Sequence, residues 1–141
     1  GGLTLSAQFT ATGLSAWVGG SVSGLSGLPL ILILAITAIV IILLTELTSN
    51  TATAAAFFPI MGSIAVGLGI EPFLMTIVVT FAVSCAFMLP VATPSNAVAF
   101  ATGDLPIKSM IRAGIWLNVI GLLVIMVALY TIVPLVFDVS F

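Results

Sequence analysis

Long apolar stretches alternate with short polar segments along the chain. The first stretch covers residues 30–44, with Thr37 as its one polar residue, and the second covers 52–68, with Pro59 and Gly62 inside it. A helix as short as the first stretch reaches about 22 Å, whereas the hydrocarbon core of a bilayer is about 30 Å thick. The pattern therefore predicts two helices, of which the first is too short for a comfortable membrane crossing.

A polar segment at residues 45–51 joins these two stretches. It contains neither Gly nor Pro and is rich in side-chain oxygens, as expected of a turn at membrane depth that must satisfy its own polar groups. This pattern favours a re-entrant helical hairpin over residues 30–68 with its tip at 45–51. Two tilted spans joined by an ordinary aqueous loop are the alternative that the lengths also allow.

A discontinuous transmembrane helix is predicted over residues 72–102. Its first part is apolar as far as Met88. Pro90 and Pro94 then remove two amide donors and disfavour helical dihedral angles in the residues before them. We therefore expect an unwound loop at 89–96, followed by a short helical continuation.

The two ends of the chain differ in polarity. Residues 1–29 are rich in Gly, Ser and Thr, and they predict an interfacial helix and loop. Residues 109–137 predict the last transmembrane helix. Lys108 and Arg112 are the two cations of the chain, so the positive-inside rule makes the loop before this helix cytoplasmic and places the C-terminus outside.

The composition, together with the apolar pattern, predicts an all-α, multi-span membrane protein. Hydrophobic residues make up 62% and charged residues 4%, whereas about a quarter of the residues in soluble domains are charged. The net charge of −2 excludes nucleic acid as a partner. The lack of histidine and the single Cys85 remove most enzyme classes, and we expect no enzyme.

The chain begins with Gly1 and supplies about four or five spans, so we expect a fragment of a longer protein.

Polar groups concentrate at the two breaks in the apolar pattern, residues 45–51 and 92–96. Hydroxyls, an Asn amide and freed backbone carbonyls are hard oxygen ligands that suit an alkali cation. Helices that restart at Thr51 and Asn96 would direct their positive ends to the same place, which favours an anion there. A cation site beside an anion site is typical of a coupled symporter. The opposing interpretation is that the hydroxyls bond to the backbone four residues earlier and the prolines only kink a helix.

Glu46 and Asn118 are polar residues in otherwise apolar surroundings. A carboxylate inside a membrane is a candidate functional group, and Glu46 would have the leading role in a proton-coupled anion carrier. The structural alternative is that Glu46 caps or braces the tip. Asn118 predicts a hydrogen bond between helices. A membrane channel or a structural helical module, with polar breaks that pack against partner helices, is a further alternative.

Two segments resemble signatures of the divalent anion/sodium symporter family, the sodium-coupled dicarboxylate and citrate transporters. Residues 45–52 are similar to the Ser-Asn-Thr signature at the tip of the family's outward-opening hairpin, and residues 89–97 are similar to the unwound loop of the following helix. The resemblance extends over the whole chain. It implies the C-terminal portion of an inverted-repeat transporter that carries a succinate-like dicarboxylate with Na⁺ by alternating access.

The resemblance also implies roles for individual residues. The residues that would contact a substrate carboxylate are Ser49, Asn50, Thr51, Thr93 and Pro94. The residues that would form the second sodium site are Thr45, Thr48, Asn50 and Ala92, the last through its backbone oxygen. Ser95 departs from the Pro that many members have at this place. The remaining N-terminal part of the transporter would supply the rest of the site, and the parent would be a homodimer in a bacterial inner membrane.

Overall fold

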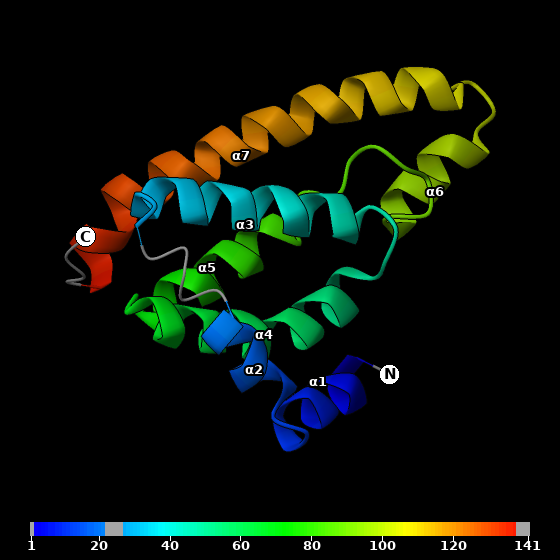
Figure 1. Ribbon diagram of the computed structural model, residues 1–141. Coiled ribbons are helices and arrows are strands. Elements are labelled where there is room, and N and C mark those ends of the chain that lie inside the picture. Colours follow the sequence, from blue (N-terminus) through cyan, green and yellow to red (C-terminus); the bar gives the residue numbers. More distant parts are fainter. Residues whose placement is uncertain (1, 22–26, 138–141) are drawn as a thin grey trace.

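The computed structural model describes residues 2–21 and 27–137, and the regular elements in these ranges are all α-helices (Figure 1). In chain order the helices are α1 (Gly2–Ala11), α2 (Leu14–Ser21), α3 (Leu30–Thr45), α4 (Asn50–Leu68), α5 (Pro72–Ala82), α6 (Pro94–Ala101) and α7 (Ile107–Phe137). Parts of the predicted interfacial loop, residues 22–26, and of the C-terminus, residues 138–141, lie outside the described residues.

Helix α5 lies at the centre of the fold. It packs against both α3 and α4, and α7 contacts α3 and α5. Helices α1 and α2 pack on α4, on the side away from α7 (Figure 1). Helices α3 and α4 therefore have α5 between them over much of their length, and they are joined by residues 46–49.

One cluster of apolar side chains holds α3, α4, α5 and α7 together. Its most deeply buried members include Leu34, Ile41, Met75, Val78 and Leu129. The outer faces of α3 and α7 carry large exposed apolar side chains, among them Leu43, Trp116 and Val127. By length and composition, two helices of the described part could cross a membrane, over Asn50–Leu68 and Ile107–Leu135. The exposed apolar faces of α3 and α7 are what contact with lipid requires.

Local sequence explains where several helices begin and end. The side chain of Thr93 caps α6 by accepting a hydrogen bond from the Asn96 N–H at 3.2 Å. Pro94 follows in the first turn, where a missing N–H donor has no cost. Gly69 ends α4 with a φ of 69°, a left-handed conformation that suits glycine, and its N–H returns to carbonyls of the last turn.

The break between α5 and α6 differs from its prediction. Helix α5 ends at Ala82 rather than at Met88, and the non-helical segment covers residues 83–93 rather than 89–96. The prolines therefore lie toward the end of this unwound segment and do not mark its start. The helix stops early because N–H groups within the segment are bound by the side chain of Glu46, which is distant in sequence.

The other helix boundaries lie close to the predicted ones. Helices α3 and α4 cover the predicted range 30–68 with a short junction at 46–49, and α7 begins slightly before the predicted start at residue 109. The predicted interfacial region at 1–29 contains two short helices, α1 and α2. These boundaries follow from the apolar pattern and from local turn residues.

Candidate functional site

The two helix breaks lie on the right side of Figure 1. They border one open cavity of about 720 Å³. The lining residues are Leu47, Thr48, Ser49, Asn50 and Thr51 from the α3–α4 junction and the start of α4, and Pro90, Val91, Ala92, Thr93, Pro94 and Ala97 from the other break. None of these described lining residues carries a charge. The cavity therefore presents hydroxyl, amide, backbone and apolar groups, and no carboxylate.

The lining residues 47–51 form the first wall of the cavity, and residues 90–94 and 97 contribute the second. Three oxygen atoms lie close together behind the first wall. The Thr45 hydroxyl donates a hydrogen bond to Asn50 Oδ1 at 2.6 Å and lies 3.3 Å from the carbonyl oxygen of Val83. Thr45 is fully buried, whereas Asn50 extends from this group to the cavity lining. A hydroxyl, an amide and a carbonyl oxygen are neutral ligands of the kind that hard cations accept.

Thr48 and Thr53 tie the junction to its neighbouring helices. The Thr48 hydroxyl donates to the Leu44 carbonyl at 2.9 Å and lies 2.5 Å from the Thr53 hydroxyl, which donates to the Ser49 carbonyl at 3.0 Å. The two bonds to carbonyls reach back four residues, as in the opposing interpretation of the hydroxyls. The junction is therefore closed by its own side chains, while Thr48 remains exposed at the cavity.

Two helices begin at the cavity. Helix α4 starts after Ser49, whose side chain forms no capping hydrogen bond in the described structure, and α6 starts after Thr93. The N-terminus of a helix carries a partial positive charge and N–H groups without helical partners. Two positive ends thus border the same cavity, an arrangement that attracts an anion.

The side chain of Asn96 stabilises the unwound segment by hydrogen bonds to its backbone. Its amide donates hydrogen bonds to the carbonyls of Ala86 at 2.9 Å and Leu89 at 3.0 Å. These bonds connect the start of α6 to the middle of the unwound segment. The prediction placed Asn96 at a helix start that faces an anion, and it did not include this use of the amide.

The predicted site residues are brought together by the fold. The five predicted substrate contacts, Ser49, Asn50, Thr51, Thr93 and Pro94, all line the cavity. Among the predicted sodium ligands, Thr48, Asn50 and Ala92 line it, and Thr45 lies behind it in contact with Asn50. The carbonyl of Val83 lies beside Thr45 in this group. No local pattern indicates it, because the residue was expected inside a helix.

Glu46 lies behind the cavity and not in its lining. Its side chain is 1% exposed, and its carboxylate accepts hydrogen bonds from the N–H groups of Phe87, Met88 and Leu89 at 2.9 to 3.1 Å. It also accepts one from Asn118 Nδ2 at 2.8 Å. Glu46 thus braces the junction against the unwound segment, the structural one of its two predicted roles. Asn118 links α7 to the end of α3, which confirms its predicted bond between helices.

Comparison with known proteins assigns the chain to a family. Residues 1–137 match the sodium:sulfate symporter transmembrane region. The chain belongs to this symporter family. The predicted resemblance to sodium-coupled transporters is thereby confirmed, and so is the prediction that the protein is not an enzyme, since its relatives are transporters.

Individual relatives of the symporter chain are sodium-dependent dicarboxylate transporters. It is 40% identical over 140 residues to the transporter SdcS of Staphylococcus aureus strain MRSA252 and 39% identical over 140 residues to SdcS of strain USA300. The alignments cover 99% of this chain and 27% of each relative. The chain therefore spans little more than a quarter of the length of these curated relatives.

A cation at the symporter cavity would be held by neutral oxygen atoms. Within residues 2–21 and 27–137, no three His, Cys, Asp or Glu side chains gather as a metal site. Hydroxyl and carbonyl oxygens suit alkali and alkaline-earth cations better than transition metals. The hydroxyl oxygen of Thr45 and the amide oxygen of Asn50 therefore fit a cation such as Na⁺, with the Val83 carbonyl beside them as an acceptor for the Thr45 proton.

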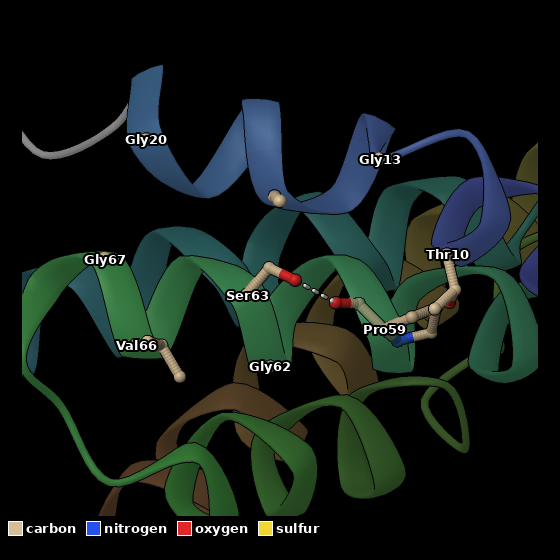
Figure 2. A pocket seen from close by; sticks show the side chains of 9 residues that line it. Thr10, Gly13, Gly20, Pro59, Gly62, Ser63, Val66 and Gly67 are labelled. Atoms are coloured by element: carbon tan, nitrogen blue, oxygen red, sulfur yellow. Dashed lines mark hydrogen bonds between the residues drawn. The ribbon is translucent and has the colours of Figure 1, made fainter.

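A separate cavity of about 490 Å³ lies between α1, α2 and α4 (Figure 2). Small residues form much of its lining, including Gly13, Gly20, Gly62 and Gly67. The Ser63 hydroxyl donates to the Pro59 carbonyl at 2.9 Å along α4, as the dashed line in Figure 2 shows. The lining has no charged side chain, so this cavity is a gap between helices that small residues leave unfilled.

Proposed function

We propose that the chain is the C-terminal portion of a secondary active transporter that carries a succinate-like dicarboxylate together with Na⁺. The main support is the meeting of two helix breaks at one uncharged polar cavity that two helix N-termini border. Helix N-termini and hydroxyls donate hydrogen bonds to carboxylates, whereas an acidic lining would repel a dianion. The names of the relatives indicate the same substrate class.

The proposed substrate contacts lie on both walls of the cavity. They are Ser49, Asn50 and Thr51 on one wall and Thr93 and Pro94 on the other. Ser49 and Thr51 are exposed at the start of α4, where hydroxyl and backbone donors are close together. Because the donors come from two helix starts, each wall can neutralise part of the charge of a divalent anion.

The proposed sodium ligands are Thr45, Thr48, Asn50 and the backbone oxygen of Ala92. The Thr45 hydroxyl can direct its proton to the Val83 carbonyl, 3.3 Å away, and leave its lone pairs and Asn50 Oδ1 free for the ion. Asn50 is shared between the two sites, since its amide has both an acceptor and donors. A bound cation there would raise anion affinity by reducing the local negative charge that the substrate introduces.

Transport is proposed to follow alternating access. Helices α3 and α4 would form a re-entrant hairpin with its tip at the cavity, within one of two inverted repeats. Na⁺ would bind first and favour the state that binds the anion, and a rigid-body movement would then expose the site to the other side. The N-terminal part of the transporter would complete the site. The parent would be a homodimer in a bacterial inner membrane, with the loop at Lys108 cytoplasmic and the C-terminus outside.

The contacts of Glu46 favour sodium coupling over proton coupling. A carboxylate that carries protons through a transport cycle needs access to the transport pathway, but Glu46 is buried outside the cavity lining. Its oxygens accept hydrogen bonds from backbone and amide N–H groups. A structural helical module would in turn not need its two polar breaks to share one cavity.

Uptake of radiolabelled succinate into proteoliposomes that contain the complete transporter tests this proposal. An inward sodium gradient is compared with a potassium gradient, for the wild type and for Asn50→Ala. We expect sodium-dependent uptake in the wild type and a loss of about a hundredfold or more in Asn50→Ala, because one residue serves both ligands.

Thr131→Ala is the matched control, since the Thr131 hydroxyl bonds within α7 to the Val127 carbonyl and faces outward. This variant should transport like the wild type. Wild-type uptake that does not depend on sodium, or full uptake by Asn50→Ala, would contradict the proposed function.

A further inference from the structure

The Glu46 network consists of the Glu46 carboxylate, the backbone N–H groups of residues 87–89 and the Asn118 amide. Every hydrogen-bond partner of the two carboxylate oxygens within the described residues is a donor. Asn118 Oδ1 is buried and has no hydrogen-bond partner within the described residues. The amide orientation is therefore set by Glu46, since the reverse orientation would place two acceptors against each other.

Helix α7 approaches the unwound segment on the same face that carries Asn118. Gly114 and Gly121 lie one turn before and one turn after Asn118, so the three residues share a helix face. A Cβ atom at Gly114 would lie 2.5 Å from the Cα atom of Met88, and one at Gly121 would lie 2.9 Å from the Sγ atom of Cys85. The unwound segment is thus held between the Glu46 carboxylate and a face of α7 that has no side chains at these two contacts.

The position of the network relative to the cavity indicates what it controls. Glu46 directly precedes the lining residues that begin at Leu47, and Leu89, whose N–H it binds, directly precedes those that begin at Pro90. The buried side chain of Glu46 therefore fixes the position of both lining segments at the residues where each begins to line the cavity. The distance between oxygen atoms on the two walls depends on these hydrogen bonds.

We propose that Glu46, oriented by Asn118, is a positioning residue for the cation site. The inference rests on the proposed function, in which Na⁺ takes ligands from both walls. Groups behind the first ligands of a metal set their spacing and orientation, and their loss lowers metal affinity. Loss of the carboxylate thus weakens sodium binding more than it weakens dicarboxylate binding at saturating sodium.

The test is the sodium concentration that gives half-maximal succinate uptake by the complete transporter in proteoliposomes. We expect Glu46→Gln to raise this concentration about tenfold or more, the effect of losing charge-assisted hydrogen bonds, because the new amide nitrogen meets N–H donors. The succinate KM at saturating sodium should change by less than about threefold. Glu71→Gln is the matched control, because Glu71 is an exposed carboxyl group at the α4–α5 turn, and it should leave both values unchanged.

A second pair of variants separates positioning from mere support of the fold. Asn118→Asp places a carboxylate against Glu46 and should also raise the half-maximal sodium concentration. Adding Glu46→Gln to that variant places an amide donor at residue 46 opposite the carboxylate acceptor at residue 118. The half-maximal sodium concentration of the double variant should therefore be at least about threefold lower than that of Asn118→Asp alone. A purely structural role would lower the amount of folded transporter and leave the half-maximal sodium concentration as in the wild type.

The outcomes distinguish this inference from the proposed function. Wild-type uptake without sodium dependence would overturn the proposed function itself. Sodium-dependent wild-type uptake with an unchanged sodium requirement in Glu46→Gln would overturn only the positioning role. If Glu46→Gln does not fold, Asn118→Ala decides, since it retains the three backbone bonds of the carboxylate: a sodium requirement raised about threefold supports the role, and an unchanged one refutes it.

Discussion

The two helix breaks that meet at the cavity are held in different ways. The α3–α4 junction, residues 46–49, is short and closed by hydrogen bonds among neighbours, such as those of Thr48 and Thr53. The unwound segment at 83–93 is longer, and three of its N–H groups bond to Glu46, at least 41 residues away in sequence. The junction thus has hydrogen bonds among its own residues, whereas the unwound segment depends on hydrogen bonds to the junction residue Glu46, which connects the two breaks.

This difference assigns different tasks to the two breaks. The junction has local hydrogen bonds that hold its own turn, in addition to the bonds of Thr45 and Glu46 to the unwound segment. A segment held from outside keeps its position only while its supports are in place. We therefore expect stability to depend most on the supports of the unwound segment, and ligand affinity to depend strongly on both breaks.

The largest effect on stability is expected at Gly114, where α7 touches the unwound segment. Gly114→Ala places a Cβ atom 2.5 Å from the Cα atom of Met88 and the carbonyl oxygen of Phe87, so backbone must move. We expect a loss of about 2–3 kcal/mol in the free energy of unfolding, the cost of overpacking a rigid contact. Thermal unfolding of the purified transporter measures it.

Gly62→Ala is the matched control for this change. A Cβ atom at Gly62 meets no described atom within 4 Å, so the substitution should be neutral or should stabilise α4 by up to about 1 kcal/mol through helix propensity. Equal effects of the two substitutions would show that the contact between α7 and the unwound segment does not hold that segment.

A smaller loss is expected when the internal support of the unwound segment is removed. Asn96→Ala leaves the carbonyls of Ala86 and Leu89 without the amide donor. We expect a loss of about 1–2 kcal/mol in the free energy of unfolding. Ser95→Ala, at the exposed neighbouring position, removes only an exposed hydrogen bond to the Thr93 hydroxyl, which water can replace. It serves as the control and should stay within about 0.5 kcal/mol of the wild type in the same thermal assay. A wild-type melting curve for Asn96→Ala would mean that the segment is held without its own amide.

The same difference explains which parts of the fold the sequence could predict. The bounds of α3 and α4 followed from two apolar stretches around a polar segment, and the start of α6 was close to Pro94, because these signals are local. The end of α5 was wrong because the residues after Ala82 are as apolar as those before it. Contacts with residues that are distant in sequence hold the segment out of the helix, among them the hydrogen bonds that Glu46 accepts from the N–H groups of residues 87–89.

The candidate site was predicted to a similar extent. Ser49, Asn50, Thr51, Thr93 and Pro94 were expected together, and all line one cavity. The meeting of the two breaks was expected from their polar residues and helix starts, whereas the family resemblance supplied the roles of the individual residues. The partner of Asn118 and the approach of the Val83 carbonyl to Thr45 depend on three-dimensional packing, so no sequence pattern could indicate them.

The smallest effect on stability is expected at Thr48, whose hydrogen bonds stay within the junction and the helix ends beside it. Thr48→Val keeps the shape of the side chain and removes the hydroxyl that bonds to the Leu44 carbonyl and lies beside Thr53. Because Thr48 is exposed at the cavity, water can replace the lost bond, and the free energy of unfolding should fall by less than about 1 kcal/mol. The sodium affinity of Thr48→Val should nevertheless fall several-fold, because a proposed ligand oxygen is gone. Thr48→Ser keeps this oxygen and should retain the wild-type sodium affinity. If Thr48→Val lost as much stability as Gly114→Ala, the junction would depend on this bond as strongly as the unwound segment depends on α7. The contrast between the two breaks would then be wrong.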